Sequence, residues 1–311
     1  MHGKSSSSGK VEKGSNVLDV GLEYFIACRP YTFTASIIPI MVTTAVVGGS
    51  FQSLEFWRTI AMGISVQSAA NLSNTYFDFV NGVDTKAMVS GDKGLVNARN
   101  ISSIGVLYLS VMCYLVGLAT VLPVFLERSD MMLPIIFFTG IALAFFYTAT
   151  PVGLKYKALG DITVYVCFGP LLMQGSSIML TGKIDPSLFL YSIPAGLLTE
   201  AILHANNARD IKSDSDAGAI TLAIMLGLRN SYYLYVFLVG SSYLALAVIS
   251  IFYNWGCSAA FLTAPLAIAV VSNFNAGVMA ETADDTAKFH LLFGLLMVLG
   301  ILYTKTGLIS I

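Results

Sequence analysis

Residues 74–84 read NTYFDFVNGVD, and residues 206–216 read NNARDIKSDSD. Both stretches contain an asparagine followed at the same spacing by two acidic residues: Asn74, Asp78 and Asp84 in the first, and Asn206, Asp210 and Asp216 in the second. Each stretch closes a long apolar segment, the second segment of the chain in one case and the sixth in the other. The same motif at the same topological position predicts a duplicated four-helix unit with carboxylates at the end of each copy.

The composition around these motifs is that of a membrane protein. Of the 311 residues, 56% are hydrophobic and 11% are charged, whereas soluble domains carry about 25% charged residues. A net charge of −1 provides no broad basic field, so we expect no nucleic-acid partner. Membrane lipid is the expected surrounding.

Nine segments are candidates for membrane-spanning helices, each of which needs roughly 20 mostly apolar residues. The predicted spans cover about 33–50, 57–81, 101–126, 132–149, 160–181, 187–210, 230–253, 257–274 and 288–309. We therefore predict an all-α, polytopic membrane protein with nine transmembrane helices. Two four-helix repeats plus one helix would surround a central cavity.

The distribution of charge predicts the domain organisation and the orientation. Residues 1–20 are rich in Ser, Gly and Lys, lack the apolar core of a signal peptide, and are expected to form a flexible tail, whereas residues 21–311 form one transmembrane domain. Most of the 17 basic residues lie in the tail or in loops on its side of the membrane. The positive-inside rule makes that side, with both acidic motifs, cytoplasmic. Basic residues that bind a substrate would give the same bias.

The spacing within the motifs predicts where the carboxylates point. Asn206, Asp210 and Asp214 are four residues apart and share one helix face, as do Asn74 and Asp78. Asp84 lies six residues after Asp78, so a turn at Asn81-Gly82 is needed to bring it back to the same place.

Carboxylate and amide oxygens arranged in this way are suited to a magnesium diphosphate. Mg²⁺ takes oxygen ligands and is held by a few carboxylates together with substrate phosphates. Two facing acidic clusters are costly to bury unless cations lie between them. The residues that we predict to ligate Mg²⁺ are Asn74, Asp78, Asp84, Asn206, Asp210 and Asp214.

The two motifs and several shorter segments resemble the UbiA superfamily of intramembrane prenyltransferases, over almost the whole chain from residue 22. The shorter segments are RPYTFTASIIP at 29–39, YTATPVGLKY at 147–156, LGD at 159–161 and TEAILHANNARD at 199–210. The second motif matches the family pattern NNxRDxxxDxxxG. The first departs from NDxxDxxxD, because Gly82 replaces the last acid and Asp84 follows it, a form similar to that of naphthoquinone-directed members.

This resemblance implies an Mg²⁺-dependent enzyme that transfers a prenyl chain from its diphosphate to an aromatic quinol. The similarity to animal members implies geranylgeranyl diphosphate and menadiol as partners, menaquinone-4 (vitamin K2) as product, and endoplasmic reticulum or Golgi membranes as location. Alternatives are a ubiquinone-type or bacterial menaquinone-type prenyltransferase, a secondary transporter, and a protein that binds prenyl diphosphate without catalysis.

Other polar residues are candidates for binding the diphosphate. Lys155 and Tyr147 flank the loop between the fourth and fifth spans and can offer a point charge and a hydroxyl donor, as the family does there. Lys155 can equally be a lysine that extends its ammonium from a span end to the interface. By resemblance, Lys93 and Arg99 help to cover the diphosphate. Arg209 either binds it or pairs with a carboxylate.

A second polar face lies deeper in the sixth span. Glu200 and His204 are four residues apart, and Asn207 continues their face. Ionisable residues inside a span are functional candidates. They either bind the quinol oxygen, with His204 or Glu200 accepting a proton, or form a mutually satisfied buried pair. Asn71, one turn before Asn74, lies near the ionising carbon according to the resemblance.

Overall fold

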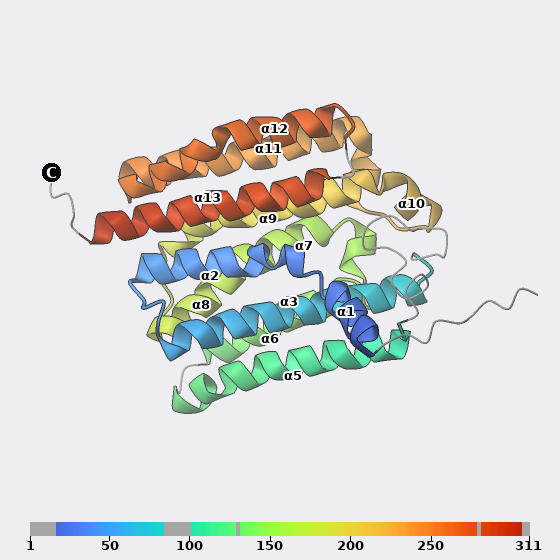
Figure 1. The fold of residues 1–311 in the computed structure, drawn as a ribbon, viewed down its shortest axis with the longest axis horizontal. Coiled ribbons are helices and arrows are strands. Elements are labelled where there is room, and N and C mark those ends of the chain that lie inside the picture. Colours follow the sequence, from blue (N-terminus) through green and yellow to red (C-terminus); the bar gives the residue numbers. More distant parts are fainter. Residues whose placement is uncertain (1–16, 84–100, 129–130, 279–280, 307–311) are drawn as a thin grey trace, which may run out of the picture.

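The computed structural model describes residues 17–83, 101–128, 131–278 and 281–306, and all regular elements in these ranges are helices. In chain order they are α1 (Val17–Ala27), η1 (Pro30–Thr32), α2 (Thr34–Val47), α3 (Leu54–Val80), α5 (Ser103–Glu127), α6 (Met132–Phe146), η2 (Leu154–Lys157), α7 (Gly160–Val166), η3 (Cys167–Leu171), α8 (Leu172–Thr181), α9 (Leu188–Arg209), α10 (Ile211–Asp216), α11 (Leu222–Phe252), η4 (Trp255–Thr263), α12 (Ala264–Asn275) and α13 (Thr282–Lys305). Figure 1 shows the long helices lying side by side, with α10 and α1 at the same end of the bundle.

Local sequence signals set the starts of several helices. The hydroxyls of Ser53, Ser102 and Thr221 accept hydrogen bonds from backbone N–H groups in the first turns of α3, α5 and α11. Such caps satisfy donors that a helix start leaves without intrahelical partners. Gly227 has non-helical dihedral angles within α11, and the predicted span 230–253 begins just beyond this kink.

Helices occupy the position of every predicted span, but length and hydropathy do not confirm nine crossings. Within the described residues, six helices are long and apolar enough to cross a membrane. A bent pair, Val20–Thr32 with Thr34–Val47, makes a seventh if it is a single span. These helices support an integral, multi-pass membrane protein. The nine-span layout and the cytoplasmic orientation stay predictions. Most of the predicted tail lies outside the described residues, and α1 begins at Val17.

The fifth predicted span is one helix with a widened turn in its middle. α7 and α8 are joined by η3, a π-helical turn that contains Pro170. Because proline has no N–H and crowds the preceding turn, it favours a local departure from α-helical bonding. Cys167, Phe168 and Leu171 of this turn line the central cavity described below.

The buried core has two larger apolar clusters, on two groups of helices, and a small third cluster around Leu72. A large apolar cluster joins α2, α9, α11, α12 and α13, and a smaller one joins α3, α5, α6 and α8. In Figure 1, α2 and the α7–α8 segment lie between the outer members of the two groups. The cavity is located along this boundary.

Candidate active site between the two acidic motifs

The first motif ends in a tight turn at Gly82. Helix α3 stops at Val80, and Gly82 has φ = 74°, a left-handed conformation that glycine adopts without steric cost. The Val83 N–H donates to the Asp78 carbonyl oxygen at 2.8 Å, closing the turn. The turn predicted from Asn81-Gly82 is therefore confirmed. Asp84, which the turn was expected to aim, lies outside the described residues.

The second motif ends in the same kind of turn. The residues that correspond between the two turns differ from those that the sequence spacing matched. Gly218 has φ = 77°, and the Ala219 N–H donates to the Asp214 carbonyl oxygen at 2.9 Å. The backbone counterpart of Asp78 is thus Asp214, whereas the sequence spacing paired Asp78 with Asp210. Sequence spacing missed this because α9 and α10 are separate helices that meet at Asp210.

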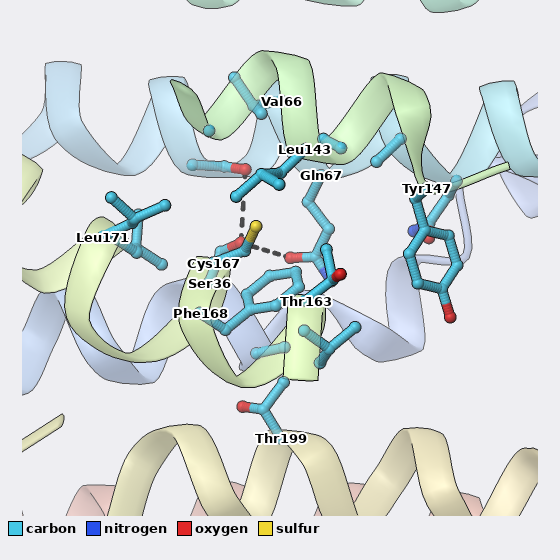
Figure 2. A pocket seen from close by; sticks show the side chains of 18 of the residues that line it. Ser36, Val66, Gln67, Leu143, Tyr147, Thr163, Cys167, Phe168, Leu171 and Thr199 are labelled. Atoms are coloured by element: carbon cyan, nitrogen blue, oxygen red, sulfur yellow. Dashed lines mark hydrogen bonds between the residues drawn. The ribbon is translucent and has the colours of Figure 1, made fainter. Parts of the chain in front are cut away.

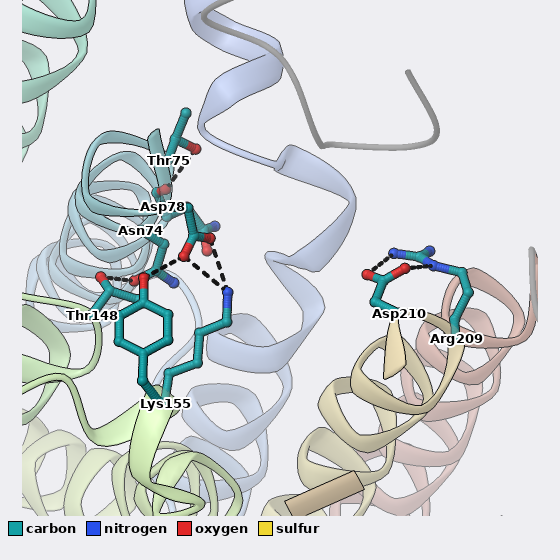
Figure 3. Close-up of polar contacts among 9 residues, drawn as sticks. Asn74, Thr75, Asp78, Thr148, Lys155, Arg209 and Asp210 are labelled. Carbon is teal, nitrogen blue, oxygen red and sulfur yellow. Dashed lines mark hydrogen bonds and ion pairs between the residues drawn. The ribbon is translucent and has the colours of Figure 1, made fainter. Parts of the chain in front are cut away.

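Asp78 lies at the centre of a buried polar cluster at the end of α3 (Figure 3). The Lys155 ammonium donates to both carboxylate oxygens, at 3.1 and 2.9 Å, and the Tyr156 hydroxyl donates to Oδ1 at 2.5 Å. One turn earlier, the Thr148 hydroxyl donates to Asn74 Oδ1 at 2.8 Å. The segment from Thr148 to Tyr156 therefore supplies three of the donors that hold the first motif.

The charge of the second motif also affects the pKa of Lys155. Burial lowers the pKa of its ammonium, but the carboxylates of Asp78 and Asp214 outweigh burial, so this pKa lies above its usual value. Burial and the same two carboxylates raise the pKa of the Tyr156 hydroxyl. Both groups therefore keep their protons at neutral pH and act as donors. Lys155 is not only an interfacial lysine, because it pairs with Asp78.

The second motif has its own cation. Arg209 donates from Nε and Nη2 to the two oxygens of Asp210, both at 3.0 Å, so it is a carboxylate partner as one reading of the sequence expected. Figure 3 shows Asp78 with Lys155 at one helix end and Asp210 with Arg209 at another. Asp214 on α10 is buried, as is Asn207 in the last turn of α9.

A cavity of about 220 Å³ begins at the two motifs and extends between α2, α3, α6, α7–α8 and α9. Asn74 and Asn206, the first residue of each motif, both line it. Most of its wall is apolar, including Phe137, Phe168 and Leu171, of which Figure 2 labels the last two. An apolar chain can therefore lie in the cavity with its polar end at the motifs.

A few polar side chains interrupt this apolar wall. Asn71 donates from Nδ2 to the Cys28 carbonyl oxygen at 2.8 Å and to the Thr32 hydroxyl at 3.2 Å. Gln67, one turn deeper, accepts from the Ser36 hydroxyl at 2.5 Å and donates to Thr32. Asn71 therefore joins α3 to the segment after α1. No position relative to a reacting carbon follows from these contacts.

Glu200 and His204 do not line the cavity. Both are buried on a neighbouring face of α9, while the cavity is lined by Thr199, Ile202, Leu203 and Asn206 of this helix. His204 Nδ1 lies 3.0 Å from Asp161 Oδ1, and its Nε2 lies 3.1 Å from the Ser231 carbonyl oxygen. The prediction that they contact the quinol is therefore not supported by this geometry. Sequence reasoning missed Asp161 as their partner, because it lies 43 residues before His204.

Tyr147 does line the cavity, as Figure 2 shows, and its hydroxyl is buried without a hydrogen-bond partner among the described residues. Sequence reasoning also missed Tyr156 and Thr148, although both stand in the YTATPVGLKY segment that it singled out. Lys93 and Arg99 lie outside the described residues.

The donor set fits a hard dication. Oxygen ligands are the chemistry that Mg²⁺ prefers. Such oxygen atoms come from Asp78, Asp210 and Asp214 with Asn74 and Asn206, of which the two asparagines line one cavity. Buried Asp78 already needs both Lys155 and Tyr156 to satisfy its charge. A diphosphate would add negative charge, and a dication would offset it.

Comparisons with known proteins show the family of this chain. The model of the UbiA prenyltransferase family matches residues 36–303. Relatives include UbiA prenyltransferase domain-containing protein 1 of Xenopus tropicalis, 37% identical over 289 residues, covering 91% of this chain and 83% of the relative. The Homo sapiens protein of the same name is 34% identical over 293 residues, covering 91% and 84%.

Solved structures have a similar fold. A UbiA homologue from Archaeoglobus fulgidus bound to DMAPP and Mg²⁺ has a TM-score of 0.61 at 14% identity, covering 89% of this chain and 99% of that one. A UbiA homologue from Aeropyrum pernix K1 has a TM-score of 0.68 at 14% identity, covering 86% and 97%.

The left-handed turn at Gly82 predicts a graded loss of turnover. A Cβ at this position meets no atom within 4 Å, so the cost is conformational, about 1–2 kcal/mol for an ordinary residue, and larger for a β-branched one. Gly82→Val should therefore slow prenyl transfer more than Gly82→Ala.

The matched control is Gly240 of α11, which also has open space but no positive φ. Initial rates for Ala and Val at both positions make the comparison. Wild-type rates for Gly82→Val would show that the turn does not position the first motif.

Proposed function

The chain belongs to the UbiA prenyltransferase family, and from that premise we propose that it transfers a geranylgeranyl chain from its diphosphate to a naphthoquinol such as menadiol, giving menaquinone-4. The observation that carries the proposal is that the first asparagine of each acidic motif lines one apolar cavity. A molecule with a charged head at the motifs and a long apolar tail matches this arrangement.

The diphosphate head would bind between the two helix ends. Asp78, Asp210 and Asp214, with Asn74 and Asn206, would hold Mg²⁺, which offsets the charge on the leaving diphosphate. Lys155 carries a proton at neutral pH, so it can donate to a phosphate oxygen as the charge there grows. Tyr156 keeps Asp78 in place through its hydroxyl.

The reaction exchanges one bond for another. The bond between the allylic carbon and the diphosphate oxygen breaks, and the electron pair leaves with the diphosphate. A ring carbon of the quinol then forms a carbon–carbon bond to the prenyl cation, and the ring proton passes to the released diphosphate or to water. The apolar wall around Phe137 and Phe168 excludes water, which would otherwise capture the cation. Aromatic rings also stabilise a nearby cation.

The cavity favours a hydroxyl-bearing acceptor. The Thr163 hydroxyl donates to the Leu159 carbonyl oxygen at 2.7 Å, and the Thr199 hydroxyl donates to the Ala195 carbonyl oxygen at 3.0 Å. Both side chains line the cavity with their protons already used, so each oxygen can only accept. A quinol offers the donors that these oxygens lack, whereas a quinone offers acceptors alone.

The function is tested with purified protein in detergent, Mg²⁺, prenyl diphosphates of several lengths, and a panel of reduced and oxidised rings. Mass spectrometry should find a geranylgeranylated naphthoquinone in the presence of menadiol and Mg²⁺, and none after Mg²⁺ is chelated. A ubiquinone-type product would show that the acceptor is a ubiquinone precursor and not the proposed naphthoquinol. Failure to prenylate any ring would contradict the proposal.

If the quinol binds beside Thr199 and the diphosphate beside Lys155, a variant at each position should affect the use of a different substrate. Thr199→Val removes one neutral hydrogen bond, worth about 0.5–1.5 kcal/mol, so the KM for the quinol should rise about 2- to 12-fold at 1.4 kcal/mol per decade. Lys155→Ala removes a charged one, worth about 1.5–3 kcal/mol. Its loss should weaken diphosphate use about 10- to 150-fold.

Steady-state rates with each substrate varied in turn make the measurement. Ser192→Ala is the control for Thr199, because Ser192 also donates to its own helix but does not line the cavity. An effect of Thr199→Val on the prenyl diphosphate KM alone would mean that the quinol lies elsewhere.

A further inference from the structure

A second group of metal-type ligands lies apart from the acidic motifs. Asp161, Glu200 and His204 are all buried, and one ligand atom from each lies within 4.8 Å of the others. Asp161 is in the first turn of α7, and the other two are on α9. None of the three lines the cavity.

The hydrogen bonds of His204 fix which nitrogen is available. Nε2 lies 3.1 Å from the Ser231 carbonyl oxygen, and a carbonyl can only accept, so Nε2 carries a proton. In a neutral ring Nδ1 then presents its lone pair, and it lies 3.0 Å from Asp161 Oδ1. Two electron-rich atoms therefore face each other unless a positive charge lies near both.

Glu200 adds a second buried carboxylate. Both of its oxygens are inaccessible, and the neighbouring polar group is the Asp161 carboxyl, itself an acid. Asp161 pairs with His204, whereas Lys155 pairs with Asp78 and Arg209 with Asp210 at the acidic motifs. Two carboxylates buried side by side are very costly unless positive charge offsets them.

We propose that Asp161, Glu200 and His204 bind a transition-metal dication, with zinc as the first candidate. Two carboxylates and a neutral imidazole balance one dication, so the buried group becomes neutral overall. One nitrogen and two oxygen ligands suit zinc, whereas Mg²⁺ takes oxygen ligands. The bond from Nε2–H to the Ser231 carbonyl is the outer-shell contact that metal-bound histidines usually make.

The metal has a positioning role. It joins the start of α7, which follows the Lys155 loop, to the turn of α9 that precedes Asn206. Through His204 and Ser231 it also ties α9 to α11. This site is separate from the Mg²⁺–diphosphate site, and it stands whether or not the proposed acceptor is correct.

Metal content and thermal unfolding test the proposal. The full chain is purified in detergent and washed with a weak chelator, and its metals are counted by mass spectrometry. We expect about one zinc per wild-type chain, and a clear loss in Glu200→Gln and His204→Gln. Stripping the wild type with a strong chelator should lower its unfolding temperature, and added zinc should restore it.

Two controls separate this site from others. Asp78→Asn should lose turnover but keep its zinc, whereas Glu127→Gln, which removes an exposed carboxylate at the end of α5, should keep both. Wild-type protein that is active without a transition metal, and whose unfolding temperature does not respond to zinc, would overturn the proposal and leave protons as the neutralising charge. Equal zinc in the wild type, Glu200→Gln and His204→Gln would also overturn it. If these variants do not fold, the wild-type measurements decide.

Discussion

The ammonium group of Lys155 pairs with the carboxylate of the first acidic motif and lies in the electrostatic field of the second, and the rest of the site depends on that position. It bonds directly to Asp78 and interacts electrostatically with Asp214, so one cation serves the ends of two helices far apart in the sequence. Its backbone N–H also donates to the Tyr147 carbonyl oxygen at 2.8 Å. The loop that carries Lys155 is thereby tied to the end of α6, beside the cavity.

The same arrangement separates a charged region from an apolar one. The carboxylates gather at one end of the bundle, where Asp78 needs several donors to remain buried. The cavity begins there and continues between apolar walls, where Cys167, Phe168 and Leu171 of the π-helical turn at Pro170 line it. A prenyl diphosphate needs both regions. Its diphosphate head requires fixed charges, and its prenyl tail requires the exclusion of water.

Much of the architecture was predictable from sequence, because apolar segments and turn residues act locally. The helices follow the predicted spans, and the turn at Gly82 follows from Asn-Gly after a helix. That Asp214 occupies the position in the second motif that Asp78 has in the first was not predictable from spacing, since it depends on the break between α9 and α10. Likewise, the contact between His204 and Asp161 was not predictable, because the two residues are distant in sequence and meet only in the fold.

The central claim is that Asp78 and Asp214 act jointly on one Mg²⁺–diphosphate. The most direct measurement is Mg²⁺-dependent release of diphosphate by wild type, Asp78→Asn, Asp214→Asn and the double variant, with folding checked by thermal unfolding. Residues that act as a unit are non-additive, so each single variant should lose nearly all release and the double variant should be no worse. Near wild-type release by either single variant, or losses that multiply in the double variant, would contradict the account.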